Sequence, residues 1–181
     1  AGIRVTAVQG PAACVTAMVL SGVPSRRFCF EAFLPQEKKE RREILEELKK
    51  ESRTIILYEA PHRLLRTLEE LRICLGGDRR ISVCRELTKK HETVRQGMIE
   101  EICAYYQQEA PRGECVLVIR GRSREEKKQE SREAWSAVSL EEHMAHYMEQ
   151  GMDRKEAMKQ VAKDRGCSKR EIYSRLLEEK K

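Results

Sequence analysis

Short apolar runs alternate with longer, helix-patterned segments from the start of the chain to about residue 121. Strands separated by helices of about a dozen residues are typical of a layered α/β domain, so we predict a mixed, largely parallel sheet. Strand patterns occur at residues 3–8, 27–33, 53–59, 79–87 and 113–121. Helix patterns occur at residues 10–22, 37–50, 61–77 and 98–108, and HETVRQG (91–97) is a short segment to which neither pattern is assigned.

The character of the sequence changes after Gly121. Residues 1–121 are predicted to form the α/β domain and residues 122–136, charged and without apolar periodicity, a linker or a solvated helix. Residues 137–181 carry three successive boxes in which a capping residue is followed three positions later by Glu, each predicting a helix start. These boxes begin at Ser139, Asp153 and Ser168. The tail is therefore predicted to be a small, all-helical, three-helix module.

Within this tail, AKDRGCSKREI has the spacing of a helix-turn-helix. Such a motif needs a small residue where the helices cross, glycine at the turn and a branched apolar residue on the second helix; Ala162, Gly166 and Ile172 match it. The second helix offers cationic side chains for phosphates and a tyrosine for stacking. The candidate RNA-binding residues are Lys169, Arg170, Tyr173 and Arg175. A plain helical hairpin with solvated lysines is the alternative.

Charge and cysteine content limit the class of protein. A formal net charge of +6 favours a polyanionic partner. The seven cysteines are scattered and form no C-x-x-C pair, which argues against a metal site and for a reducing compartment. No apolar run is long enough to span a bilayer. We therefore expect a cytoplasmic protein that binds neither metal nor membrane.

Polar side chains crowd the ends of two neighbouring strand patterns. RTIILYE is followed at once by Pro61, His62 and Arg63, and ISVCREL runs into TKKHE. Ligands of open α/β sheets collect outside the carboxyl ends of the strands, so both segments are predicted to border one polar cleft. The candidate catalytic residues are Glu59, His62, Arg63, Arg85, Glu86 and Lys89. A local ion pair from Glu59 to Arg63, four residues apart, explains the first segment without any ligand.

The first helix start, VQGPAA, places backbone N–H groups at the same kind of edge, where a carboxylate or phosphate can bind. The sequence contains no G-x-G-x-x-G, P-loop or G-x-S-x-G pattern. Dinucleotide, nucleoside triphosphate and serine hydrolase chemistries therefore lack their usual sequence support.

Four segments together resemble the second half of the tetrapyrrole methylase superfamily, in order and spacing. They are the run from VTAVQGPAACV to EAFLP, RTIILYEAPHRLLRTLEEL, VCRELTKKHETVRQG and RGECVLVIRG. The Tyr-Glu-x-Pro-His-Arg and Arg-Glu-Leu-Thr-Lys-x-His-Glu motifs are similar to a branch that 2′-O-methylates a cytidine ribose of small-subunit ribosomal RNA. The resemblance implies S-adenosylmethionine as cofactor, ribosomal RNA or the small ribosomal subunit as partner, and a homodimer.

The resemblance also implies which residues border the cofactor, mainly through backbone atoms. They are Gly10, Pro11, Ala12, Ala13, Tyr58, Glu59, Cys115 and Val116. On the acceptor side, Arg63 and Arg85 would hold phosphates and Lys89 would polarise the ribose hydroxyl. Glu59 or Glu86 would orient these groups.

The sequence departs from the family pattern in three places. Ala12 and Ala60 stand where the family has serine, so contacts there must come from the backbone. The glycine-rich first domain of the family is absent, and the cofactor of the family lies between the two domains. The chain is therefore expected to be a C-terminal part with half of the cofactor site and little or no methyl transfer by itself.

Two other functions remain open at this point. One is methylation of a small tetrapyrrole, which does not explain the basic charge or the helical tail. The other is a nucleic-acid-binding regulator whose α/β domain senses a ligand.

Overall fold

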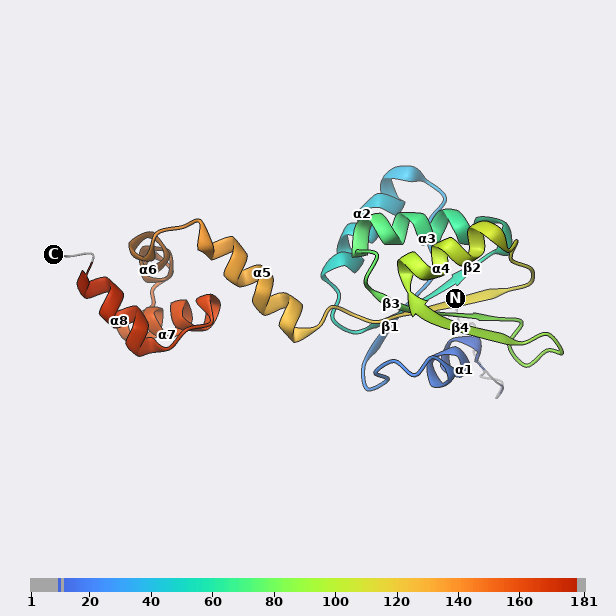
Figure 1. Ribbon diagram of the computed structural model, residues 1–181, viewed down its shortest axis with the longest axis horizontal. Helices are drawn as coiled ribbons and strands as arrows, with labels where there is room; N and C mark the ends of the chain where they lie inside the picture. The colour runs from blue at the N-terminus through green and yellow to red at the C-terminus, as the bar shows by residue number, and fades with distance from the viewer. Residues whose placement is uncertain (1–9, 11, 179–181) are drawn as a thin grey trace, which may run out of the picture. The chain divides into compact units, whose positions relative to one another are not determined.

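The computed structural model describes residue 10 and residues 12–178, and the chain divides into two compact units, residues 1–122 and 123–181 (Figure 1). The predicted strand at residues 3–8 and the cofactor candidate Pro11 lie outside the described residues.

The first unit contains one five-stranded sheet in the order β1-β2-β5-β3-β4. Its strands are β1 (Phe28–Phe33), β2 (Thr54–Glu59), β3 (Arg80–Arg85), β4 (Thr93–Met98) and β5 (Cys115–Ile119). Its helices are α1 (Ala13–Leu20), α2 (Lys38–Lys50), α3 (Pro61–Leu75) and α4 (Ile99–Gln108). The layered α/β class and the mixed sheet are thus confirmed.

The prediction that the sheet is largely parallel is wrong. Among the described strands, only β1 and β2 pair in parallel, whereas β2 with β5, β5 with β3 and β3 with β4 are antiparallel. Strand β5 inserts between β2 and β3, so these two strands, which run in the same direction, do not pair with each other. The segment to which neither pattern is assigned also forms an exposed edge strand, β4, whose polar residues give no apolar alternation.

Helices cover both faces of the sheet, as Figure 1 shows, with α2, α3 and α4 on one face and α1 on the other. The larger core packs Ile55, Leu57, Leu64 and Leu117 among the three helices. The smaller core packs Ala17 of α1 against Ile56, Cys84, Val116 and Val118 of the sheet. Alternate residues of each strand therefore face different helices, because side chains alternate across a strand.

Helix α3 starts where its sequence predicts. Pro61 occupies its first turn, where the missing N–H costs nothing, and Gly76 ends it at φ 97°, a conformation that glycine adopts readily. Since β2 ends at Glu59, only Ala60 separates strand and helix. This tight junction keeps Glu59, His62 and Arg63 close to the end of β2.

The second unit consists of α5 (Arg124–Ser136), α6 (Leu140–Glu149), α7 (Arg154–Arg165) and α8 (Lys169–Glu178). Ser139, Asp153 and Ser168 accept backbone N–H groups three residues ahead, as predicted. The segment predicted to be a linker or solvated helix forms α5, which packs on α7. Leu140, Val161, Ala162, Ile172 and Leu176 share the small core of this unit.

Gly166 ends α7 in the left-handed conformation at φ 65°, and Ala162 and Ile172 are buried on either side of the turn. The three positions of the predicted helix-turn-helix thus have the expected local geometry. All seven cysteines are free thiols. Among the described residues, no helix is long and apolar enough to cross a membrane.

Candidate functional site

The ends of β2 and β3 lie on either side of the start of β5 and carry polar side chains. Glu59 is paired with Cys115, and Cys115 with Arg85 in the register of the sheet. Because β5 is antiparallel to its neighbours, its beginning, not its end, lies at this edge. The predicted catalytic residues Glu59 and Arg85 and the predicted cofactor residue Cys115 are therefore brought together, on the face covered by α2, α3 and α4.

The side chains of Tyr58 and Val116 lie on the opposite face, with α1. The cofactor residues predicted from the resemblance are thus divided between the two faces of the sheet. Only backbone atoms of β2 and β5 are common to both.

Glu59 is the centre of a buried polar network. One carboxylate oxygen accepts the Ala60 N–H at 2.8 Å and lies 3.0 Å from Nε of Arg63. The Arg63 N–H is not aimed at this oxygen, so the contact is an ion pair without a hydrogen bond. The other oxygen accepts the Thr67 hydroxyl at 2.6 Å. The predicted Glu59–Arg63 ion pair is present, and the Glu59 carboxylate has several partners within the protein.

This network extends to α2. The Thr67 hydroxyl also accepts a hydrogen bond from Arg41 at 2.8 Å, and Arg41 Nε donates to Glu70 at 2.6 Å. Glu70 in turn accepts from Arg66 at 3.0 Å. Arg41 is almost fully buried, where an unpaired charge would be costly, and these partners compensate its charge.

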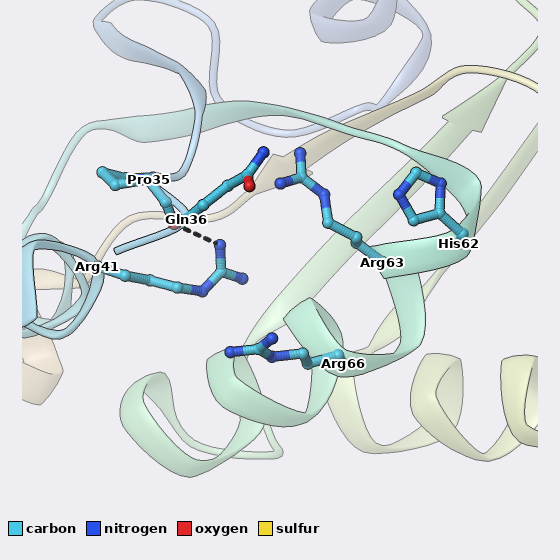
Figure 2. Close-up of a pocket in the computed structure, with 6 residues that line it drawn as sticks. All are labelled: Pro35, Gln36, Arg41, His62, Arg63 and Arg66. Carbon is cyan, nitrogen blue, oxygen red and sulfur yellow. Dashed lines mark hydrogen bonds between the residues drawn. The ribbon is translucent and has the colours of Figure 1, made fainter. Parts of the chain in front are cut away.

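A hollow of about 340 Å³ opens beside this network, with a lining that includes Gln36, Arg41, His62, Arg63 and Arg66. Figure 2 shows the Arg63 and Arg66 side chains extending from α3 toward the segment that carries Gln36 and Arg41. Arg41 also donates to the carbonyl of Pro35 at 3.3 Å, the dashed contact in Figure 2. Of the residues that the structure describes, no acidic side chain lines this hollow, whose chemistry suits an anion.

Glu86 and Lys89 form a second cluster in the loop after β3. Lys89 Nζ lies 3.2 Å from Glu86 and 3.1 Å from Glu114, and Glu86 accepts the Glu114 N–H at 3.0 Å. Glu86 and Thr88 have positive φ angles of 50° and 63°. This unfavourable backbone is held by the contacts of the loop.

Glu86 and Lys89 stabilise each other in their charged forms. The Glu114 N–H and the Lys89 ammonium lower the pKa of Glu86, and the Glu114 and Glu86 carboxylates raise the pKa of Lys89. Lys89 is therefore an ammonium donor near neutral pH and not a base.

Arg85 reaches toward α4. Burial raises the pKa of Tyr106, and the nearby Arg85 guanidinium opposes this rise. Burial likewise raises the pKa of Cys115 to about 11, again against the effect of Arg85. The buried Nε of Arg85 has no hydrogen-bond partner among the described residues. Arg85 is thus a half-buried cation on the same face of the sheet as Glu59, and its Nε has unused donor capacity.

On the α1 face, Tyr58 links the sheet to the start of α1. Its hydroxyl accepts the Cys14 N–H at 3.2 Å, and its ring meets Phe30 and Phe33 edge-on at 4.9 and 5.7 Å. Ala12, at the start of α1, makes no side-chain capping bond, as expected from its missing hydroxyl. Gly10 and Ala12 are exposed beside this helix start.

In the second unit, the candidate RNA-binding side chains of α8 are all exposed, whereas Ile172 and Leu176 are buried. The buried apolar residues of α8 therefore leave its basic residues exposed to solvent. Sequence reasoning missed Arg41, Thr67 and Glu70. The available signal was an arginine on the apolar stripe of α2, at one end of the spacing 41, 45 and 48.

The arrangement is an α/β fold shared with a solved methyltransferase. The structure described as "Crystal structure of the methyltransferase CobJ" has a TM-score of 0.50 and 18% identity, over 62% of this chain and 48% of that chain. The likeness shows a common fold. The model of the Tetrapyrrole (Corrin/Porphyrin) Methylases matches residues 1–103, and the chain belongs to that family.

Curated relatives are more similar in sequence. Two proteins named Ribosomal RNA small subunit methyltransferase I are each 43% identical to this chain. The one from Halalkalibacterium halodurans matches 96% of this chain and 59% of its own length, and the one from Bacillus subtilis matches 95% and 58%. The chain thus spans less than two thirds of these relatives.

Proposed function

We propose that this chain contributes to S-adenosylmethionine-dependent 2′-O-methylation of a cytidine ribose in small-subunit ribosomal RNA. The observation that carries the proposal is the 43% identity, over nearly the whole chain including the helical tail, to relatives named for ribosomal RNA methylation. The partner would be ribosomal RNA or the small ribosomal subunit, in the cytoplasm. A homodimer remains a prediction from the family resemblance.

The α1 face has residues that fit part of S-adenosylmethionine. The start of α1 has no side-chain cap from Ala12, and besides the Cys14 N–H, which Tyr58 accepts, it would present backbone N–H groups to a carboxylate. The exposed rings of Phe30 and Phe33 beside Tyr58 offer aromatic contacts for an adenine. The bound cofactor would supply the methyl group. Gly10, Ala12, Ala13 and Tyr58 would hold it, whereas Glu59 and Cys115 would contribute only backbone atoms.

The acceptor side would lie among the charged groups of the sheet edge. Arg63 and Arg85 carry guanidinium groups with donor capacity for phosphates. Lys89, held as an ammonium by two carboxylates, would donate to the ribose hydroxyl and favour loss of its proton. Glu59 and Glu86 would act by orienting Arg63 and Lys89.

The tail would add affinity for RNA through Lys169, Arg170, Tyr173 and Arg175. Methylation of a small tetrapyrrole gives this exposed basic face no role. A ligand-sensing regulator, in turn, does not account for the match to the methylase family.

Methyl transfer tests the proposal. Small ribosomal subunits lacking the modification would be incubated with radiolabelled S-adenosylmethionine and the gene product that contains these 181 residues. We expect label at a cytidine that becomes resistant to alkaline cleavage, as 2′-O-methylation requires. Label on a base, or on a tetrapyrrole and not on RNA, would refute the proposal.

A further inference from the structure

A second hollow adjoins the one beside Glu59. It is a groove of about 450 Å³ between α2 and α3, and Arg41 and Arg66 line both hollows. The groove adds Lys38, Arg42 and Lys49, which are exposed residues of α2. The two hollows are therefore adjacent on the α2–α3 side of the first unit, and together we call them the α2–α3 track.

The α2–α3 track is strongly cationic. Its lining includes six Lys and Arg side chains, against two acidic side chains, Glu46 and Glu70. Glu70 is already paired with Arg41 and Arg66. An excess of positive charge in a depression attracts a polyanion more strongly than the same charge on a convex surface.

Helix α2 contributes four cationic side chains to the track, Lys38, Arg41, Arg42 and Lys49, and one carboxylate, Glu46. Its other exposed carboxylates, Glu40, Glu43 and Glu47, do not line the track. The side of α2 that lines the track is therefore predominantly basic.

The buried network holds part of the track in place. Arg41 is fixed by Glu70, Thr67 and the Pro35 carbonyl, and Glu70 also fixes Arg66. Cationic groups that are already ordered lose little conformational entropy when they bind a ligand. Ile73, with 80% of its surface exposed, offers an apolar contact within the same groove.

We propose that the α2–α3 track binds the phosphodiester backbone of single-stranded RNA, with Arg66 as the contact at which the two hollows join. This inference rests on the proposed RNA substrate and adds a binding surface at Lys38, Arg42, Lys49 and Arg66. Repeated phosphates match two consecutive cationic hollows. The guanidinium groups pair with phosphate oxygens, while Ile73 contacts a ribose or a base.

Binding of a fluorescent single-stranded RNA to the 181-residue chain tests this inference, measured by anisotropy over a range of salt concentrations. Arg66→Gln and Lys49→Gln are the test variants. Arg72→Gln is the matched control, because Arg72 is an exposed arginine of α3 that lines neither hollow. We expect each test variant to weaken affinity about 5- to 10-fold and to lower the salt slope by about 0.7. The control should match the parent chain.

Each outcome is decisive. If the test variants match Arg72→Gln in RNA affinity and salt slope, the track does not bind RNA. The proposal is also refuted if the parent chain binds an acidic peptide of the same charge as tightly as the RNA. No RNA binding by the parent chain would also overturn it. Methyl transfer is measured separately. If the test variants lose RNA affinity as expected but no methyl transfer occurs, the proposed function alone is refuted. If methyl transfer occurs but the test variants bind RNA like the parent chain, RNA binding by the track alone is refuted.

Discussion

At the scale of single residues, Glu59 illustrates how a candidate catalytic group can also be structural. Its carboxylate joins the end of β2 to α3 through Ala60, Arg63 and Thr67. The sequence predicted both the ion pair and a position at the strand end. It did not predict the extension of this network from Thr67 to Arg41, because a contact between residues 26 apart in sequence has no local signature.

The first prediction concerns stability. Glu59→Gln removes a buried charge that compensates Arg63, and it weakens the bond to Thr67. We expect a loss of about 2–4 kcal/mol in the free energy of unfolding, measured by urea denaturation. Glu114→Gln is the control, because the Glu114 side chain is 87% exposed and should cost less than about 0.5 kcal/mol. Equal effects of the two changes would show that the Glu59 network contributes no stability.

The second prediction concerns Lys89. If its ammonium donates to the ribose hydroxyl, Lys89→Gln should lower the rate of methyl transfer about 100-fold in the gene product that contains this chain. Lys89→Arg, which keeps a positive charge, should recover part of the rate. The neighbouring exposed Lys90 gives the control, Lys90→Gln, and equal rates for the two glutamine variants would exclude this role for Lys89.

At the scale of elements, the second unit owes its cohesion partly to a buried histidine. His143 stacks on Trp135 with ring centroids 3.5 Å apart, and its Nδ1 accepts a hydrogen bond from Arg165 at 3.1 Å. Its Nε2 lies 3.5 Å from the Asp164 carboxylate. Burial and the Arg165 charge lower the pKa of His143, and the opposing effect of Asp164 is smaller.

The third prediction follows from this lowered pKa. Since the unfolded chain binds the His143 proton more readily, the free energy of unfolding should fall as the pH drops below about 6.5, the ordinary pKa of histidine. Trp135, the single tryptophan, reports unfolding of this unit by fluorescence. His143→Gln should reduce the difference between pH 7.5 and pH 5.5. An unchanged difference would assign the pH dependence to other groups.

The fourth prediction concerns the turn between α7 and α8. Gly166→Ala places a side chain at φ 65° and against Arg132, so we expect a loss of about 1–2 kcal/mol, measured by the same fluorescence. Gly166→Asn should lose less, because asparagine tolerates this conformation better. Equal losses would mean that contact with Arg132, and not backbone strain, sets the cost.

At the scale of the whole molecule, the element types were largely predictable and the strand order was not. Periodicity and capping residues identified α1 to α4 and α6 to α8, because these signals are local. The position of β5 between β2 and β3 depends on pairing between distant segments. Edge strand β4 was missed because TVRQGM alternates no apolar residues. The candidate site could not be predicted in full for the same reason, because the position of Cys115 between Glu59 and Arg85 depends on the direction of β5.

Methyl transfer to small ribosomal subunits tests the central claim most directly. The gene product that contains this chain should transfer a labelled methyl group from S-adenosylmethionine to one cytidine ribose of the small-subunit RNA. The same assay on the Lys89→Gln variant should show a large loss. Absence of label in the RNA, with the label found instead on a small tetrapyrrole, would contradict the account.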